Sequence, residues 1–151
     1  MVSRRGFCYR VIMLRMDVKE LDRFLDEAFP QARTFGFEID ELDEEHIRLR
    51  LPVSKQHLRP GGTVNGPVLM SLADSATYML VLARLGPVAL AVTVSLNINF
   101  MRKPRPGVLL ADARLLKLGK RIVVAEVRIS GEDEPELYAH ATVTYSLPPD
   151  R

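Results

Sequence analysis

One carboxylate inside an apolar stretch is the most informative feature of this sequence. Residues 67–83 are apolar at most positions, yet Asp74 lies near their middle. Burying an ionised carboxylate is costly unless another group pairs with it or a function requires it. An aspartate in such a place could act as a general base or as a nucleophile. It could instead cap a loop or pair with a buried arginine.

A glycine-containing loop precedes this stretch. Residues 61–66 read GGTVNG, and Pro67 follows. Proline suits the first turn of a helix because its missing N–H would have no intrahelical partner, so Asn65 or Gly66 is the expected N-cap. Backbone N–H groups at a helix start, strengthened by the helix dipole, can stabilise a developing oxyanion. Gly66 is therefore a candidate oxyanion donor, or simply a cap.

The apolar pattern predicts the elements that position these groups. Apolar residues three and four apart, from Asp17 onward, predict an amphipathic helix that ends at Pro30 and packs on a sheet edge or rim. Apolar and polar residues that alternate predict half-buried strands. The strands are expected over residues 35–42, 46–52, 91–101, 108–118, 121–130 and 137–147, and the apolar helix from Pro67 to about Arg84.

Six strands and one very apolar helix favour an α+β fold, in which a curved antiparallel sheet wraps around the helix. Polar residues on the second face of the strands indicate that this face is exposed to solvent or packs against another subunit. At 151 residues, one domain is the leading expectation. We assign it to residues 16–147, with residues 1–15 as a leader of unclear order and residues 148–151 as a tail.

Composition excludes several classes of function. A formal net charge of +2 is too mild to indicate nucleic acid or an acidic membrane as a partner. Cys8 is alone, which leaves no intrachain disulfide and fits a reducing cytoplasm. No signal peptide is expected, and residues 67–83 fall short of the ~20 apolar residues of a membrane span. The three histidines lack ligand spacing, so we expect them on the surface or in loops and propose no metal.

The order of loop, apolar helix with an internal aspartate and four further strands resembles the hotdog fold. The motif is similar to that of the PaaI-like acyl-CoA thioesterases, in which Asn-x-x-Gly-x-x-His-Gly-Gly precedes an apolar helix carrying Leu-x-Asp. Residues 59–67 read RPGGTVNGP and residues 72–74 read LAD, with the family's interval between the His position and the Asp. The similarity covers residues 33–147. Arg59, Asn65 and Pro67 depart from the family's Asn, His and Gly.

The resemblance implies hydrolysis of an aryl- or fatty-acyl-CoA thioester. Asp74 would then be the base or nucleophile, and Thr93 would lie where a hydroxyl helps to place the attacking water. Asn65 could polarise the carbonyl group in place of the family's histidine, or could serve only as a cap. Thr93 could also be no more than one polar position on an alternating strand. Coenzyme A belongs to the substrate, and no cofactor is implied.

Basic residues near the motif could bind the phosphates of coenzyme A, since guanidinium groups suit phosphate. Arg59 belongs to the glycine loop, and Arg102, Lys103 and Arg105 follow the strand over residues 91–101. The last three could equally be solvated charges at the end of a strand. Tyr78 lies one turn beyond Asp74, where it could line the acyl tunnel or hydrogen-bond the carboxylate, as Ser71 and Ser75 could.

Helix geometry favours a shared site. Asp74 lies eight residues beyond Gly66, which is ~12 Å along one helix. One carbonyl carbon cannot lie within ~3 Å of both groups. Two such helices that run antiparallel about a two-fold axis would bring Gly66 of one chain to Asp74 of the other. We therefore expect a homodimer with shared sites, either alone or as half of a dimer of dimers.

Two other functions fit the pattern less well. One alternative is a hotdog hydratase or dehydratase. The resemblance associates that chemistry with a histidine paired with a carboxylate, and Asn65 at the histidine position argues against it. A non-catalytic acyl-CoA-binding protein is the other alternative, which the departures at Arg59, Asn65 and Pro67 leave open.

Overall fold

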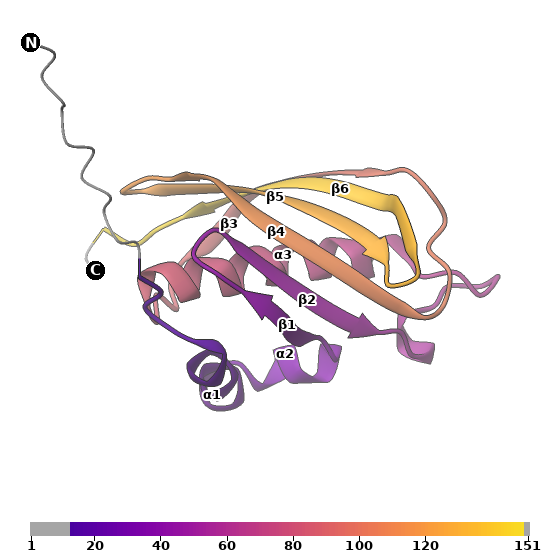
Figure 1. The fold of residues 1–151 in the computed structure, drawn as a ribbon, viewed down its shortest axis with the longest axis horizontal. Helices are drawn as coiled ribbons and strands as arrows, with labels where there is room; N and C mark the ends of the chain where they lie inside the picture. The colour runs from indigo at the N-terminus through magenta and orange to yellow at the C-terminus, as the bar shows by residue number, and fades with distance from the viewer. Residues whose placement is uncertain (1–12, 150–151) are drawn as a thin grey trace, which may run out of the picture.

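Helix α3 (Gly66–Leu85) lies at the centre of the molecule, and a curved antiparallel sheet wraps around it (Figure 1). The computed structural model describes residues 13–149. Helices α1 (Val18–Ala28) and α2 (Pro30–Phe35) lie outside the sheet, below it in Figure 1. The strands are β1 (Glu38–Leu42), β2 (His46–Pro52), β3 (Val92–Phe100), β4 (Val108–Leu118), β5 (Ile122–Gly131) and β6 (Glu134–Ser146).

The six strands form one sheet in the order β1-β2-β4-β5-β6-β3, and every neighbouring pair is antiparallel. The expected α+β arrangement is therefore confirmed. Strands β1 and β3 form the two edges. Because β3 pairs only with β6, the segment that directly follows α3 forms one of these edges.

The core lies between α3 and the inner face of the sheet. Large side chains of α3, such as Leu72 and Leu80, are fully buried. The inner face of the sheet carries large buried side chains such as Leu49 and Ile129. Between them lie small residues, which leave room for close packing against the helix. Those residues are Ala111, Ala113, Ala125, Ala139 and Ala141, all fully buried.

Helix α3 covers the range predicted from Pro67 to about Arg84 and is one residue longer at each end, so the expectation that it is too short to span a membrane is wrong. Helix α3 has 20 residues, so by length and composition it could cross a membrane. However, 67% of its most apolar window is buried inside the protein. Burial under the sheet thus accounts for its composition, since a helix apolar on nearly every side needs cover on nearly every side.

The first helix is placed correctly along the chain but packs differently from expectation. Asp17 caps α1 in a capping box with Glu20, each side chain bonding the other's backbone N–H. Phe24 of α1 contacts Tyr78 of α3 edge-on, with ring centroids 6.4 Å apart. Helix α1 therefore packs against α3 and not on a sheet edge.

Pro30 ends α1 and also begins α2, which the sequence analysis missed. Proline is favourable at the first position of a helix. The short helix ends at Gly36, whose φ of 96° is the left-handed conformation that glycine adopts without strain. The first strand consequently starts at Glu38 and not at Phe35.

A β-bulge breaks the alternation expected over residues 91–101. Thr93 pairs with Tyr145, whereas Ser95 pairs with Thr144, so Val94 is the extra residue. An extra residue reverses which face the side chains before it occupy. Thr93 therefore joins Leu96 on the inner face, although strict alternation places it outside with Ser95.

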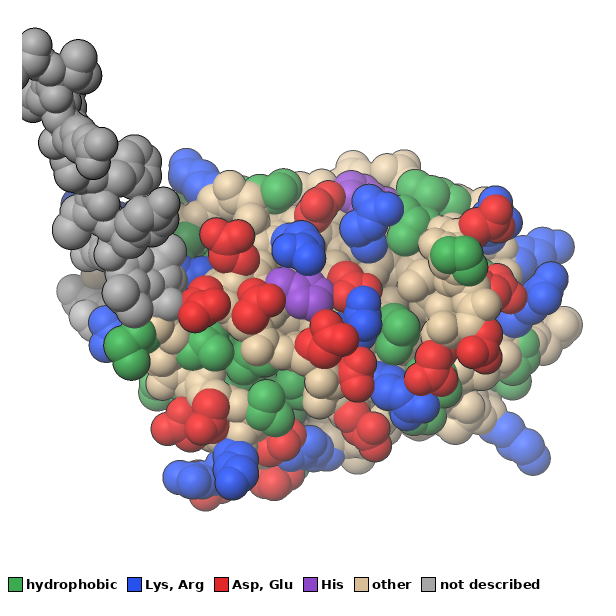
Figure 2. Space-filling view, in the orientation of Figure 1, with side chains coloured by type: hydrophobic (Ala, Val, Ile, Leu, Met, Phe, Trp, Pro, Cys, Tyr) green, Lys and Arg blue, Asp and Glu red, His purple; other side chains and the backbone are tan. Residues whose placement is uncertain are grey.

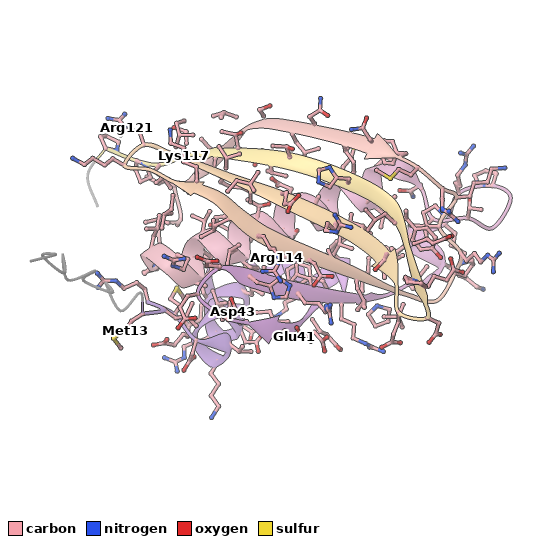
Figure 3. All side chains as sticks on the ribbon, turned by 45° about the horizontal axis from the view of Figure 1, so that its top comes forward. Met13, Glu41, Asp43, Arg114, Lys117 and Arg121 are labelled. Atoms are coloured by element: carbon pink, nitrogen blue, oxygen red, sulfur yellow. The ribbon has the colours of Figure 1, made fainter. Side chains whose placement is uncertain are left out.

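The outer face of the sheet carries charges of both signs, as Figure 2 shows. Asp112 accepts hydrogen bonds from Arg48 at 2.9 Å and, at 2.7 Å, contacts His46. Figure 3 shows Arg114 on the same face, with Glu41 and Asp43 toward the β1 edge. His46 is only 6% exposed, so the expectation of a surface histidine is wrong there.

Part of the predicted leader packs against the helix. The backbone N–H groups of Arg15 and Met16 donate to the carbonyl of Ala83, and Met16 is buried. Residues 1–12 of that leader and residues 150–151 of the tail lie outside the described residues. The domain boundaries remain a prediction.

Candidate active site

Asp74 is half-buried on α3, and two hydroxyl groups hold one of its oxygens. Thr93 donates from Oγ1 to Asp74 Oδ1 at 2.6 Å, and the Tyr145 hydroxyl donates to the same oxygen at 2.8 Å. Thr93 and Tyr145 face each other across β3 and β6, so both hydroxyls emerge side by side. Among the described residues no donor occupies Oδ2. One carboxylate oxygen is thus fixed and the other is available for chemistry.

Tyr145 is a site residue that the sequence analysis missed. Tyr145 lies on the buried face of β6 with Ala141 and Val143 and is 3% exposed. A buried tyrosine hydroxyl usually finds a polar partner, which is the signal that could have identified it. Burial, and then the charge of Asp74, raise the pKa of Tyr145 well above its usual value near 10. It therefore remains a hydrogen-bond donor at neutral pH.

Other groups expected to bond Asp74 do not. Ser71 and Ser75 make no hydrogen bond to the carboxylate among the described residues, and no arginine there pairs with it. The Tyr78 hydroxyl donates to the carbonyl of Ala89 at 3.3 Å. Its ring stacks on Tyr145, with centroids 5.9 Å apart. Tyr78 therefore supports Tyr145 and contacts the carboxylate only indirectly.

A cavity of about 460 Å³ opens beside Asp74. It lies between α1, α3 and the start of β3. Most of its walls are apolar or aromatic, and Thr93, Asp74 and the Tyr145 hydroxyl supply the polar groups. We call it the aromatic cavity; it is lined by Phe24, Ala28, Phe29, Asp74, Tyr78, Ala89, Ala91, Val92, Thr93 and Tyr145.

Asn65 is the N-cap of α3. Its Oδ1 accepts a hydrogen bond from the Val68 N–H at 2.9 Å. Within residues 13–149 its Nδ2 amide has no hydrogen-bond partner. Asn65 can therefore cap the helix with Oδ1 and still donate a hydrogen bond from Nδ2 to a carbonyl group, because the two roles use different atoms of the side chain. Pro67 occupies the second helical position, after Gly66.

The backbone does not require glycine at position 66. The residue has no positive φ, and an added Cβ would lie 3.5 Å from the Phe100 ring, an ordinary van der Waals distance. Glycine is also used where a ligand approaches the backbone closely. Gly66 lines a cavity of about 420 Å³, in agreement with that reason.

This second cavity, which we call the basic cavity, collects three of the four basic residues singled out in the sequence. Arg59, Arg102 and Lys103 line it, together with Gly66. Arg105 does not line it and instead lies 3.4 Å from Glu134. Arg102 is paired with Glu136, whereas Arg59 and Lys103 make no ion pair among the described residues.

His57 holds the loop that leads to Gly66. It lies in the segment between β2 and α3, as expected, but is only 2% exposed, so a surface position is wrong for this residue. Its Nδ1 accepts from the Ser54 N–H at 2.9 Å, and its Nε2 lies 2.9 Å from the Phe35 carbonyl, so the partners assign the proton to Nε2. The His57 carbonyl accepts from the Asn65 N–H. His57 thereby ties the end of α2, through its imidazole, to the start of α3, through its backbone carbonyl.

Asp74 and Gly66 line different cavities of one chain. The eight-residue spacing along α3 produces this separation. One chain thus presents two separate cavities, one with the Asp74 carboxylate and one with the start of α3 beside basic side chains.

The comparisons with known proteins identify the family. A model of the thioesterase superfamily matches residues 61–144, which include α3, strands β3 to β5 and most of β6. A putative esterase of Saccharolobus solfataricus is 30% identical over 106 residues, covering 68% of this chain and 70% of that protein. The chain belongs to the thioesterase superfamily, and its fold is the hotdog fold.

Solved structures agree with this assignment. A putative thioesterase from Silicibacter sp. TM1040 is 46% identical, with a TM-score of 0.84, and the match covers 93% of this chain and 97% of that one. A putative thioesterase from Ralstonia eutropha is 29% identical, with a TM-score of 0.74 over 84% of this chain and 98% of that one. The resemblance seen in the sequence is confirmed, and the family supports a thioesterase activity.

The raised pKa of Tyr145 predicts a stability effect at alkaline pH. An unfolded tyrosine loses its proton near pH ~10, whereas folded Tyr145 keeps it to higher pH. Its contribution to stability is therefore complete below that pH and is lost as the pH rises further, by about 1.4 kcal/mol per unit. Urea unfolding between pH ~9 and ~11 should show a shallower loss of stability in Tyr145→Phe than in the wild type. Equal slopes would contradict the assignment.

Proposed function

We propose that this protein hydrolyses the thioester of an acyl-CoA, with Asp74 as the general base or nucleophile. The observation that carries the proposal is the hydrogen bonding of Asp74. Thr93 and Tyr145 fix Oδ1, and Oδ2 has no donor among the described residues. A carboxylate held in this way, at the wall of a largely apolar cavity, is prepared to accept a proton from water or to attack a carbonyl carbon.

The chain's groups fit the steps of ester hydrolysis. Water adds to the thioester carbonyl while Asp74 Oδ2 takes its proton. The oxyanion that forms receives a hydrogen bond from the Gly66 N–H at the start of a second chain's α3. The tetrahedral intermediate then collapses, and its carbon–sulfur bond breaks. The coenzyme A sulfur receives the proton held by Asp74 and leaves as the thiol, so the carboxylate is restored and the free acid remains. Thr93 donates its proton to Asp74, so its remaining lone pair can accept a hydrogen bond from the attacking water.

The two edges of the sheet support a homodimer formed through β3. Edge strand β1 carries Glu38, Asp40 and Glu41, and charged edges resist pairing with another strand. Strand β3 has no charged side chain between Val92 and Phe100. Val92, Val94 and Phe100 are between 52% and 56% exposed. An uncharged edge with exposed apolar residues is suited to pair with the same edge of a second copy.

Pairing of this kind also unites the aromatic cavity of one chain with the basic cavity of the other. Antiparallel β3 strands relate the two chains by a two-fold axis, so their α3 helices run in opposite directions. The helix start and basic cavity of one chain then approach Asp74 of the other. Arg59, Arg102 and Lys103 would meet the phosphates of coenzyme A, with the acyl group in the partner's aromatic cavity.

Relatives lend support to a coenzyme A thioester as the substrate. A Listeria monocytogenes protein named 1,4-dihydroxy-2-naphthoyl-CoA hydrolase is 26% identical over 67% of this chain and 82% of its own. The Ralstonia eutropha structure is named a phenylacetic acid degradation-related protein. Both names concern acids with an aromatic ring, and a cavity walled by Phe24, Phe29 and Tyr78 could receive such a ring.

Asp74→Asn should abolish most turnover without unfolding the protein. The amide oxygen can still accept from Thr93 and Tyr145, but an amide cannot act as a base, so kcat should fall on the order of 10²- to 10⁴-fold. Thiol release from a panel of aryl- and fatty-acyl-CoA thioesters measures this. Asp40→Asn, on the exposed edge of β1, is the matched control and should keep full activity.

Unchanged turnover in Asp74→Asn would refute the role of the carboxylate. If the wild type releases no thiol from any thioester but binds acyl-CoA tightly, the protein is a binder. Hydration of an enoyl-CoA by the wild type would indicate the hydratase alternative.

Gly66→Pro should remove the oxyanion donor and little else. Asn65 has φ −75° and ψ 154°, which a residue before proline readily adopts. The loss of one oxyanion donor should reduce kcat by about 10²- to 10³-fold. Gly66→Ala keeps the N–H and fits beside Phe100, so it is the matched control and should retain more activity than Gly66→Pro.

Mixing the two inactive variants tests whether chains share sites. After subunit exchange between equal amounts of Asp74→Asn and Gly66→Pro, about half the dimers are mixed, and each has one intact site. Activity should recover to about one quarter of the wild-type value. No recovery despite exchange, shown by native mass spectrometry, would refute shared sites.

Val94→Lys should prevent dimer formation. A lysine on the β3 edge places like charges against each other across the two-fold axis. Light scattering should then report a monomer of 17.0 kDa, with thioesterase activity lost. Asp40→Lys, which puts the same side chain on the β1 edge, should leave both mass and activity unchanged. A dimeric Val94→Lys protein would contradict pairing through β3.

A further inference from the structure

Asp74 borders a third hollow in addition to the aromatic cavity. This smaller cavity, of about 280 Å³, lies between α2 and α3. We call it the serine cavity, because Ser71 and Ser75 of α3 face Gln31, Ala32 and Phe35 of α2 across it. Three residues line both cavities, namely Phe29, Asp74 and Tyr78. The carboxylate is therefore open to two spaces on one side of α3.

A pair of aromatic rings separates these two spaces. Phe29 meets Tyr78 edge-on, with ring centroids 6.3 Å apart and planes at 82°. Both rings contribute to the walls of both cavities, so the pair forms the partition between them. A group bound beside Asp74 in the aromatic cavity would have to pass these rings to reach the serine cavity.

The two halves of the partition are held very differently. Tyr78 stacks on Tyr145, contacts Phe24 and donates from its hydroxyl to the Ala89 carbonyl. Phe29 has one ring contact among the described residues, with Tyr78, and is 41% exposed. It lies at the joint between α1 and α2, where it is the C-cap of one helix and the N-cap of the other. Phe29 is thus the half of the partition that can be removed without disturbing Asp74.

We propose that Phe29 sets the length of the acyl group that is accepted at Asp74. This inference rests on the proposed thioesterase function. With the Phe29 ring in place, the acyl group is confined to the aromatic cavity. An apolar cavity of about 150 Å³ already holds benzene, so a compact acyl group, aryl or short aliphatic, has ample room there. A long linear chain is excluded because the ring blocks its way into the serine cavity.

Removing the ring should join the two cavities. The added methylene groups of a longer chain would then be buried against Ala32 and Phe35 on the far side. Burial of one methylene group corresponds to a gain of on the order of fourfold in binding. Phe29→Ala should therefore shift the preferred acyl chain to greater length and raise kcat/KM for decanoyl-CoA relative to butanoyl-CoA at least tenfold.

Matched variants distinguish removal of the partition from enlargement of a single cavity. Phe24→Ala enlarges only the aromatic cavity, since Phe24 does not line the serine cavity. It should admit bulkier short acyl groups without a shift in chain length. Phe35→Ala enlarges only the serine cavity, behind an intact partition, and should keep the wild-type profile. Phe29→Tyr retains a ring and should keep it as well.

The experiment measures kcat/KM for linear acyl-CoA thioesters from acetyl to dodecanoyl, and for benzoyl-CoA, with each variant. A folded Phe29→Ala protein, shown by an unchanged thermal unfolding curve, whose chain-length profile equals that of the wild type would overturn the proposal. So would a Phe35→Ala protein that shifts as far as Phe29→Ala, because chains would then pass the ring in the wild type.

Failure of the proposed function would be recognised separately. A wild type that releases no thiol from any thioester refutes hydrolysis but not the partition. In that case the dissociation constants of acyl-CoA thioether analogues, which cannot be hydrolysed, are measured over the same chain lengths. A shift toward longer chains in Phe29→Ala supports the partition, and identical series for wild type and Phe29→Ala refute it.

Discussion

The hydrogen bonds that Thr93 and Tyr145 donate to one oxygen of Asp74 are the interaction on which the site depends. They make an ionisable group acceptable inside a largely apolar helix, because a buried polar group must find partners. They also give the carboxylate a direction, with one oxygen held and the other without a donor among the described residues. Helix α3 supplies the charge, and the β3–β6 pair supplies the hydroxyls that control it.

Much of the surrounding structure brings these three side chains together. The bulge at Val94 turns Thr93 toward the helix, and the register of β3 on β6 places Tyr145 directly opposite. Stacking of the Tyr78 ring on the Tyr145 ring helps to hold the Tyr145 hydroxyl in place. At the other end of α3, His57 and the Asn65 cap hold the loop that presents the Gly66 N–H. Eight residues of α3 separate Gly66 from Asp74, so the two groups line different cavities of one chain.

The same separation explains how specificity can vary independently of chemistry. The basic cavity lies beside the helix start, and the aromatic and serine cavities flank Asp74. Many of the residues that line the aromatic and serine cavities come from α1, α2 and their joint at Phe29, which are not part of the sheet. Changes there alter the space beside the carboxylate and leave its hydrogen bonds intact. The hotdog scaffold thus keeps Asp74 and its two hydroxyl partners on α3, β3 and β6.

The sequence by itself determined the features that depend on local pattern. The periodicity of apolar residues predicted α3 and all six strands, and the Asn65-Gly66-Pro67 run predicted the helix start, since caps and periods involve neighbouring residues. Asp74 was identifiable because it is an ionisable residue within a largely apolar stretch. Only the tertiary structure decided the face of Thr93, because one bulged residue reverses the alternation. It also decided the partnership of Asp74 with Tyr145, which are 71 residues apart, and the burial of His46 and His57. These features arise from packing between distant segments, which no local period encodes.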